Sequence, residues 1–259
     1  MAVTDVRGRF LWYDLMTTDP AGGQAFYAKI AGWGLQLLDG LGMPYTMFTR
    51  QGIPVGGSMQ LPEEATKMGA PPHWLAYVGT PDVDQTVALA TELGARTYVA
   101  PQDIPSVGRF AVMADPQGAT IAFYTPLNDQ PGSHAPEIGE VSWHELTTTD
   151  LDGAMRFYQQ VTGWEQTGTH EMGDSGPYRM FGQGGYTLGG MMKKPADMPA
   201  PSHWTLYIRV PGIQKGVADV KDSGGQVLMG PHEVPGGDWI AVCCDPQGAV
   251  FALHQRKVG

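Results

Sequence analysis

The chain has 259 residues, 42% of them hydrophobic and 16% charged, which is typical of a globular protein with room for two ordinary domains. Its formal net charge of −10, without a cluster of lysine or arginine, argues against nucleic acid as a partner. No apolar run approaches the roughly 20 residues of a membrane-spanning helix, so we do not expect this chain to be a membrane protein. The two cysteines exclude a disulfide framework, and the opening residues do not resemble a secretory signal, so we expect a cytoplasmic protein.

The first elements expected along the chain are a strand and a helix. Residues 10–17 form an apolar, β-prone run. Asp19 followed by proline is typical of a helix N-terminus, because its carboxylate can cap the first turn and proline fits there. Phe26 and Ile30 share one helical face, and Gly32 ends the helix.

The remainder of the first half repeats this pattern of a strand, a helix and further strands. Two strands are expected at 45–49 and 55–61. A second unit then begins with a strand at 73–79 and a helix from Asp82 to Gly94. Three strands complete it at 96–100, 110–114 and 120–124. We therefore expect two βαβββ modules in this half of the chain.

The second half of the sequence matches the first. WYDLMTTD at 12–19 corresponds to WHELTTTD at 143–150, and a Phe-Tyr pair begins seven residues after each. Further matches keep the same order, namely Gly32-Trp33 with Gly163-Trp164, Pro44-Tyr45 with Pro177-Tyr178, Gly56-Gly57 with Gly189-Gly190, His73-Trp74 with His203-Trp204, and Asp115-Pro-Gln-Gly with Asp245-Pro-Gln-Gly. The repeat predicts two homologous domains, 7–126 and 140–259, joined by a Pro- and Gly-rich linker at 127–139.

These motifs resemble the vicinal-oxygen-chelate superfamily of glyoxalases, bleomycin-resistance proteins and extradiol dioxygenases. The resemblance rests on the Asp that opens the first helix before Phe-Tyr, the Gly-Trp that closes it, and the Asp-Pro-x-Gly near the last strand. It covers nearly the whole chain. It implies an α+β fold in which four βαβββ modules form two tandem glyoxalase-like domains, each a curved, mostly antiparallel sheet around a cleft.

The resemblance also implies where a divalent metal would bind, and those positions hold unsuitable residues. The first ligand position falls on Trp12 and Trp143, seven residues before the helix-start Asp. The other positions fall on Leu75 and Thr205, on Ala122 and Ala252, and near Gly57-Ser58 and Gly190-Met191. Metals need three or four converging oxygen, nitrogen or sulfur donors. We therefore expect no metal and no other cofactor.

Other polar and aromatic side chains share strand faces with these positions, because residues two apart on a strand point the same way. The candidates for acid–base catalysis are Asp14, Glu145, His73 and His203. The candidates for ligand contact are Trp12, Tyr77, Tyr124, Trp143, Thr205, Tyr207 and His254. A displaced two-histidine, one-carboxylate metal site would consist of Glu145, His203 and His254.

Structural roles compete with these functional ones. His73 and His203 could each bond a loop carbonyl at the start of a strand, and Asp14 and Glu145 could be buried carboxylates with local donors. By strand alternation His144 points away from the cleft, toward the helices or the surface. The tryptophans Trp33, Trp74, Trp164 and Trp204 are expected to anchor the core.

Three classes of function remain open. The favoured one is a protein that binds a small aromatic or carbonyl molecule and could convert it without metal, using Asp14 with His73 or Glu145 with His203. A second is a metal-dependent lyase, dioxygenase or hydroxylase that uses the displaced site; any enzyme is expected to be a glyoxalase-like lyase or isomerase, or oxygenase-like. A third is an interaction protein that binds no small ligand. We expect a monomer or homodimer.

Overall fold

The computed structural model describes residues 6–39, 42–130 and 134–257. The first module comprises β1 (Phe10–Thr17), α1 (Pro20–Ala31), β2 (Gly34–Leu38), β3 (Tyr45–Arg50) and β4 (Ile53–Gln60). After the short helix α2 (Glu63–Lys67), the second comprises β5 (His73–Gly79), α3 (Val83–Glu92), β6 (Arg96–Ile104), β7 (Gly108–Ala114) and β8 (Thr120–Pro126). The expected βαβββ order is thus confirmed, with β2 and α2 as elements that the sequence reading did not locate.

The second half repeats this order. Its third module comprises β9 (Val141–Thr148), α4 (Leu151–Thr162), β10 (Glu165–Glu171), the single 3-10 turn η1 (Gly173–Ser175), β11 (Pro177–Gln183) and β12 (Tyr186–Lys193). The fourth comprises β13 (His203–Arg209), α5 (Ile213–Asp222), β14 (Gln226–Glu233), β15 (Trp239–Cys244) and β16 (Val250–Gln255).

Each half forms one mixed sheet of eight strands with the same strand order. The order is β2-β3-β4-β1-β5-β8-β7-β6 in the first half and β10-β11-β12-β9-β13-β16-β15-β14 in the second. Within a module the first and last strands pair in parallel, as β1 does with β4 and β9 with β12. The hairpins between the other strands are antiparallel. The α+β class and the two tandem sheets of one topology are therefore confirmed.

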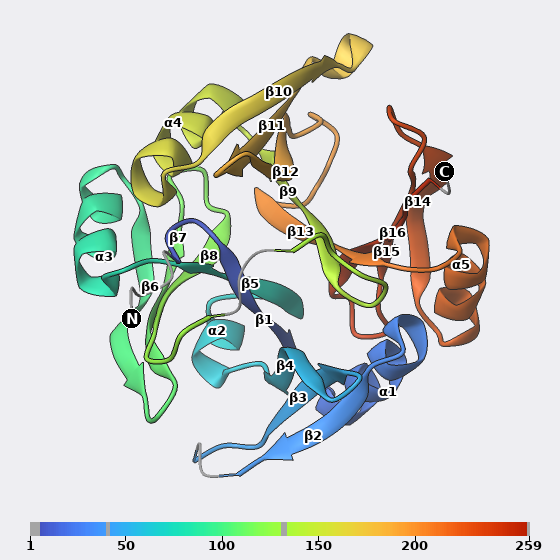
Figure 1. Cartoon of the computed structure of the whole chain (residues 1–259), viewed down its shortest axis with the longest axis horizontal. Helices are drawn as coiled ribbons and strands as arrows, with labels where there is room; N and C mark the ends of the chain where they lie inside the picture. Colours follow the sequence, from blue (N-terminus) through green and yellow to red (C-terminus); the bar gives the residue numbers. More distant parts are fainter. Residues whose placement is uncertain (1–5, 40–41, 131–133, 258–259) are drawn as a thin grey trace. The chain divides into compact units, whose positions relative to one another are not determined.

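The modules also group into two compact units, and this grouping does not follow the repeat. Unit 1 contains residues 1–12, 76–134 and 143–204, so it combines the second and third modules. Unit 2 contains residues 13–75, 135–142 and 205–259, which combines the first and fourth. Accordingly α3 packs beside α4, and α1 beside α5 (Figure 1). The domain boundaries 7–126 and 140–259, which come from the sequence repeat, remain a prediction. The sequence alone did not say which modules pair.

A buried chain of hydrogen bonds joins the two modules of unit 2. The indole Nε1 of Trp74 donates to the Tyr27 hydroxyl at 2.9 Å, and that hydroxyl donates to Oδ2 of Asp245 at 3.2 Å. The Tyr27 side chain is fully buried. The other carboxylate oxygen of Asp245 accepts from the backbone N–H groups of Gln247 and Ala249. One carboxylate thus both closes the Asp-Pro-Gln-Gly turn and holds α1.

Unit 1 contains the same chain built from the corresponding residues. Trp204 Nε1 donates to the Tyr158 hydroxyl at 3.1 Å, and Tyr158 donates to Asp115 Oδ2 at 3.0 Å. Burial raises the pKa of Asp115, while the hydrogen bonds from Ala119 N–H and Tyr158 oppose that rise. The His-Trp, Phe-Tyr and Asp-Pro-Gln-Gly motifs of the sequence are therefore parts of one structural device.

Two further tryptophans, Trp33 and Trp164, fix the C-terminal ends of α1 and α4. Trp33 Nε1 donates to the Gly139 carbonyl, and Trp164 Nε1 to the Gly8 carbonyl, each at 2.6 Å. The four tryptophans expected in the core are all buried. In unit 1 Trp164 and Trp204 lie in a cluster with Phe157, Tyr158, Phe181 and aliphatic side chains from both modules.

His144 is buried on the helix side of unit 1, as strand alternation predicted. Its ring lies parallel to that of Phe10 with 3.5 Å between centroids, and its Nδ1 donates to the Leu188 carbonyl at 2.8 Å. Burial lowers the pKa of His144 to about 3, with only the Leu188 carbonyl opposing it.

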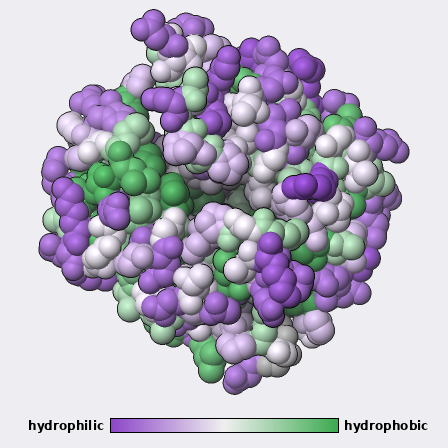
Figure 2. Space-filling view, turned by 180° about the vertical axis from the view of Figure 1, so that it is seen from behind, coloured by the Kyte–Doolittle hydropathy of each residue, from purple (hydrophilic) through white to green (hydrophobic). Residues whose placement is uncertain are grey.

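The visible face in Figure 2 is largely hydrophilic, with separate hydrophobic areas between the polar residues. Within the described ranges, no helix combines the length and apolar character that a membrane crossing requires.

Replacement of Tyr158 by Phe should lower the free energy of unfolding by about 1–3 kcal/mol, because a buried carboxylate loses a donor and an indole N–H loses its acceptor. Tyr27→Phe should have a similar effect in unit 2. Urea unfolding followed by circular dichroism measures both. Tyr186, which is exposed, provides the control Tyr186→Phe. Equal stability of Tyr158→Phe and this control would contradict the structural role.

Because the imidazole of His144 is buried, the free energy of unfolding should fall in acid. Between pH 6.5, the ordinary value for histidine, and about pH 3, the unfolded chain binds a proton that native His144 does not. The free energy of unfolding should therefore drop by up to about 3 kcal/mol between pH 7 and pH 4 from this group, at about 1.36 kcal/mol per pH unit. His144→Phe keeps the stacked ring and should remove this component in denaturant titrations, whereas exposed His170→Phe should not. Identical pH dependence in wild type and His144→Phe would refute the assignment.

Candidate functional site

The two faces of each central strand have different surroundings. In β1, Leu15 and Thr17 are fully buried, and both lie near Gly23 of α1. Alternation therefore places Asp14 on the face of the strand opposite α1. In β9, Leu146 belongs to the helix-side core of unit 1, so Glu145 lies on the opposite face.

In unit 2, Asp14 pairs with a tyrosine from a neighbouring hairpin. The Tyr45 hydroxyl donates to Asp14 Oδ1 at 2.6 Å, and Asp14 is only 5% exposed. Gly57 stands opposite Asp14 in the parallel ladder. A Cβ at Gly57 would overlap the ring and hydroxyl of Tyr45. The glycine is therefore required for the tyrosine to cross the strand and reach the carboxylate.

Unit 1 has the corresponding pair with one more donor. Tyr178 donates from its hydroxyl to Glu145 Oε2 at 3.0 Å, and Trp143 Nε1 donates to the same hydroxyl at 2.8 Å. Gly190 stands opposite Glu145, and a Cβ there would overlap the Tyr178 ring. Burial, followed by the nearby Glu145 carboxylate, raises the pKa of Tyr178. The phenol therefore stays protonated and acts as a donor to the carboxylate.

His73 and His203 occupy matching positions at the starts of β5 and β13. Each Nδ1 donates to the carbonyl of the residue two before it, Pro71 or Pro201, at 2.8 Å. This is the structural contact that the sequence offered as an alternative. It also puts the proton of the neutral ring on Nδ1, which leaves Nε2 as the basic nitrogen. Burial lowers the pKa of His73, and the Pro71 carbonyl opposes that shift.

His254 in unit 2 has two side-chain partners that the sequence reading missed. Its Nδ1 lies 2.7 Å from Ser142 Oγ, and its Nε2 lies 2.9 Å from Asp238 Oδ2. Ser142 Oγ also lies 3.2 Å from the Tyr207 carbonyl. Thr205, another expected contact residue, is buried in β13.

Trp12, Tyr77 and Tyr124 are further aromatic candidates in unit 1. Tyr77 and Tyr124 make a perpendicular ring contact with 6.4 Å between centroids, and the Tyr124 hydroxyl donates to the Val107 carbonyl at 3.0 Å. Trp12 is half-buried and belongs to unit 1, whereas Asp14, two residues later, belongs to unit 2.

The residues present do not fit a divalent metal. Across residues 6–39, 42–130 and 134–257, no three His, Cys, Asp or Glu side chains are grouped as ligands. The displaced set of Glu145, His203 and His254 is not such a group, and both nitrogens of His254 are hydrogen-bonded to side chains. At the family's ligand positions stand indole, methyl, isobutyl and hydroxyl groups and glycine. We therefore assign no metal-dependent step.

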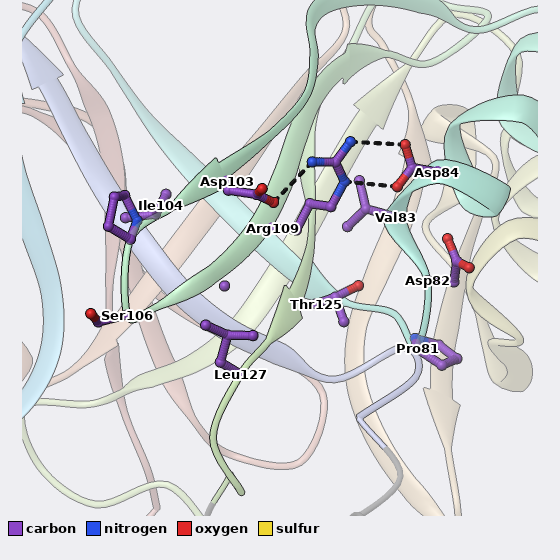
Figure 3. Close-up of a pocket in the computed structure, with 12 residues that line it drawn as sticks. Pro81, Asp82, Val83, Asp84, Asp103, Ile104, Ser106, Arg109, Thr125 and Leu127 are labelled. Atoms are coloured by element: carbon purple, nitrogen blue, oxygen red, sulfur yellow. Dashed lines mark hydrogen bonds and ion pairs between the residues drawn. The ribbon is translucent and has the colours of Figure 1, made fainter.

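A separate open pocket of about 480 Å³ lies beside the start of α3 in unit 1. Figure 3 shows Arg109 at its centre, bonded to both carboxylate oxygens of Asp84 at 2.7 and 3.0 Å and to Asp103 at 2.9 Å. Pro81, Ile104 and Leu127 contribute apolar surface. The pocket contains none of the residues expected at the site from the sequence.

Tyr45, Tyr178 and the two glycines were visible in the sequence only as matches between the halves. The matched Pro-Tyr and Gly-Gly pairs were the available signal, since a tyrosine diagonal to a glycine on the adjacent strand, two residues along the ladder, can reach across it. Ser142 and Asp238 gave no such signal, because they have different residues, Leu11 and Gly108, at the corresponding positions of the first half.

Comparison with known proteins places each half in one superfamily. Residues 11–123 match the glyoxalase-like domain, and residues 138–253 match the glyoxalase/bleomycin resistance protein/dioxygenase superfamily. The chain is 33% identical over 245 residues to the Mycobacterium tuberculosis protein named "Putative glyoxylase CFP32", covering 93% of this chain and 92% of the relative. It is 26% identical over 259 residues to the anthracycline biosynthesis protein DnrV of Streptomyces peucetius, covering 96% and 93%.

Among solved structures, the fold is similar to that of the Mn(II)-bound glyoxalase from Novosphingobium aromaticivorans. The TM-score is 0.60 at 16% identity, with 97% of this chain and 82% of the other covered. At this identity the likeness concerns the fold alone. The sequence matches, which span both halves, show that the chain belongs to the glyoxalase/bleomycin resistance protein/dioxygenase superfamily.

Proposed function

We propose that the protein binds a small organic molecule, aromatic or carbonyl-bearing, at the tyrosine–carboxylate pair of each unit. The observation that carries this proposal is the repetition of one arrangement, Tyr45 with Asp14 and Tyr178 with Glu145. Each tyrosine crosses a glycine on the strand face opposite the first helix of its module. A packing role alone would not require a carboxylate in both copies, because burying one costs free energy that an apolar residue would not.

The chemistry of the pair favours a ligand that donates hydrogen bonds or carries positive charge. A carboxylate has about four acceptor sites, so one that accepts a tyrosine hydroxyl can also accept from a ligand. The tyrosine holds the carboxylate in one orientation. In unit 1 the indole of Trp143, fixed to Tyr178 by its N–H, offers an aromatic surface to the ligand. The relative named for anthracycline biosynthesis supports a small organic molecule as the ligand class.

Turnover without metal would use the carboxylate together with the histidine of the same unit. Asp14 and His73 both belong to unit 2, and Glu145 and His203 both belong to unit 1. Because each histidine holds its proton on Nδ1, its Nε2 can accept a proton from a substrate. This assignment favours proton transfer at an acidic O–H, or at a C–H next to a carbonyl.

The proposal predicts a matched loss of binding in carboxamide variants. Glu145→Gln and Asp14→Asn keep the shape but remove the charge, and should weaken binding of donor or cationic ligands about 10- to 100-fold, as expected for hydrogen bonds to charged groups. Tryptophan fluorescence titration with a panel of aromatic and carbonyl compounds measures this, because Trp143 lies beside Glu145. Exposed Glu165→Gln is the control. Unchanged affinities in both carboxamide variants would overturn the role of the pairs.

Metal content tests the metal-free part of the proposal separately. Plasma emission analysis after mild purification should find far less than one equivalent of zinc, nickel, iron or manganese per unit, because the donor set does not fit these ions. Added metal should leave the ligand affinities unchanged. About one tightly held ion per unit would show that a ligand set other than the expected one forms.

A further inference from the structure

Three side chains of unit 2 form a line of hydrogen bonds that the proposed binding function does not use. Ser142 Oγ lies 2.7 Å from His254 Nδ1, and His254 Nε2 lies 2.9 Å from Asp238 Oδ2. Ser142 is near the start of β9, His254 is in β16, and Asp238 immediately precedes β15. Ile240 of β15 pairs with His254 of β16, and this ladder holds Asp238 and His254 in register.

Asp238 is placed to orient the imidazole. Although burial works against ionisation, the Lys257 backbone N–H and the His254 ring together hold the pKa of Asp238 below its usual range. Its other oxygen accepts from Lys257 N at 2.8 Å, which fixes the carboxylate plane. Because an ionised carboxylate only accepts, His254 Nε2 carries the proton. In the neutral ring Nδ1 is then an acceptor 2.7 Å from Ser142 Oγ. It is the nearer of two acceptors for the single hydroxyl proton, the other being the Tyr207 carbonyl at 3.2 Å.

The line is a property of this unit and not of the fold. By the repeat, the positions of Ser142, His254 and Asp238 correspond to Leu11, Tyr124 and Gly108. There the Tyr124 hydroxyl donates to the Val107 carbonyl instead. The same strands therefore assemble without a histidine or a carboxylate at these positions, so the fold itself does not require the three residues.

The group is also open to solvent. The side chains of His254 and Asp238 are 14% and 31% exposed, and Ser142 is half-buried. A serine whose hydroxyl points at a carboxylate-oriented imidazole, within reach of solvent, is the arrangement that activates a nucleophile.

We infer that Ser142, His254 and Asp238 form an acyl-transfer site that takes activated esters or thioesters. Ser142 Oγ attacks the acyl carbon, its proton passes to His254 Nδ1, and the protonated imidazole returns that proton to the departing alcohol or thiol. Water then cleaves the acyl-serine ester by the same proton path, which releases the acid. Ser142 and His254 are the catalytic residues, and Asp238 is a positioning residue.

A fluorophosphonate reagent tests the nucleophile directly on the whole protein. The Ser142 oxygen should displace fluoride from phosphorus, and peptide mass spectrometry should find the adduct on Ser142. His254→Gln should slow labelling at least about 100-fold, the scale of general-base catalysis. Asp238→Asn should slow it about 10-fold or more, and Asp238→Glu should recover part of that loss because it restores an acceptor for Nε2. Hydrolysis of p-nitrophenyl acetate should follow the same order.

Two outcomes would overturn the inference. One is a wild-type protein in which Ser142 stays unlabelled; the group is then a structural ion pair between a protonated His254 and Asp238. The other is labelling of Ser142 at the same rate in His254→Gln. Ser142→Ala should abolish both labelling and hydrolysis, while Ser175→Ala, at an exposed serine, should change neither. Labelling reports on Ser142 alone and the fluorescence titration on the tyrosine–carboxylate pairs, so failure of the proposed binding function and failure of this inference are distinguishable.

Discussion

The structure depends on a buried aspartate that must be supplied with hydrogen bonds. Asp115 and Asp245 lie inside the protein, where an unpaired carboxylate would cost several kcal/mol. Each takes two bonds from the backbone of its own turn and one from a tyrosine in the first helix of a different module. The requirement of one carboxylate thus selects which modules pack together, and a tryptophan N–H orients the tyrosine that meets it.

Because these buried carboxylates have their hydrogen bonds on the helix side of each sheet, the residues on the opposite face of the strands can vary. The two units retain the tyrosine–carboxylate pair there, with aspartate in one and glutamate in the other. They differ near the ends of the last strands, where one has Tyr124 and the other has His254 with Ser142 and Asp238. Two copies of one fold therefore offer different chemistry without different packing.

The sequence predicted the modules well because their boundaries have local causes. Asp19 caps α1 through the Gly22 N–H, and Gly32 ends it in the left-handed conformation, as the motif required. The pairing of modules could not be read in this way, since no local pattern says that Tyr27 meets Asp245. Whether Glu145, His203 and His254 meet was equally beyond the sequence, because strand alternation says which face a side chain lies on and not which side chains come together. Ser142 and Asp238 are single-copy residues, so a search by repetition passed over them.

The pairing also sets an order of folding during synthesis. Tyr158 and Asp115 are 43 residues apart in the sequence, whereas Tyr27 and Asp245 are 218 apart. Unit 1 has both of its modules once residue 204 has left the ribosome, but unit 2 must wait for the fourth module. Until then the first module exposes an apolar helix face and an edge strand, β2, that contains no charged residue. During synthesis the first module thus waits longest with apolar surface and an unpaired strand edge uncovered.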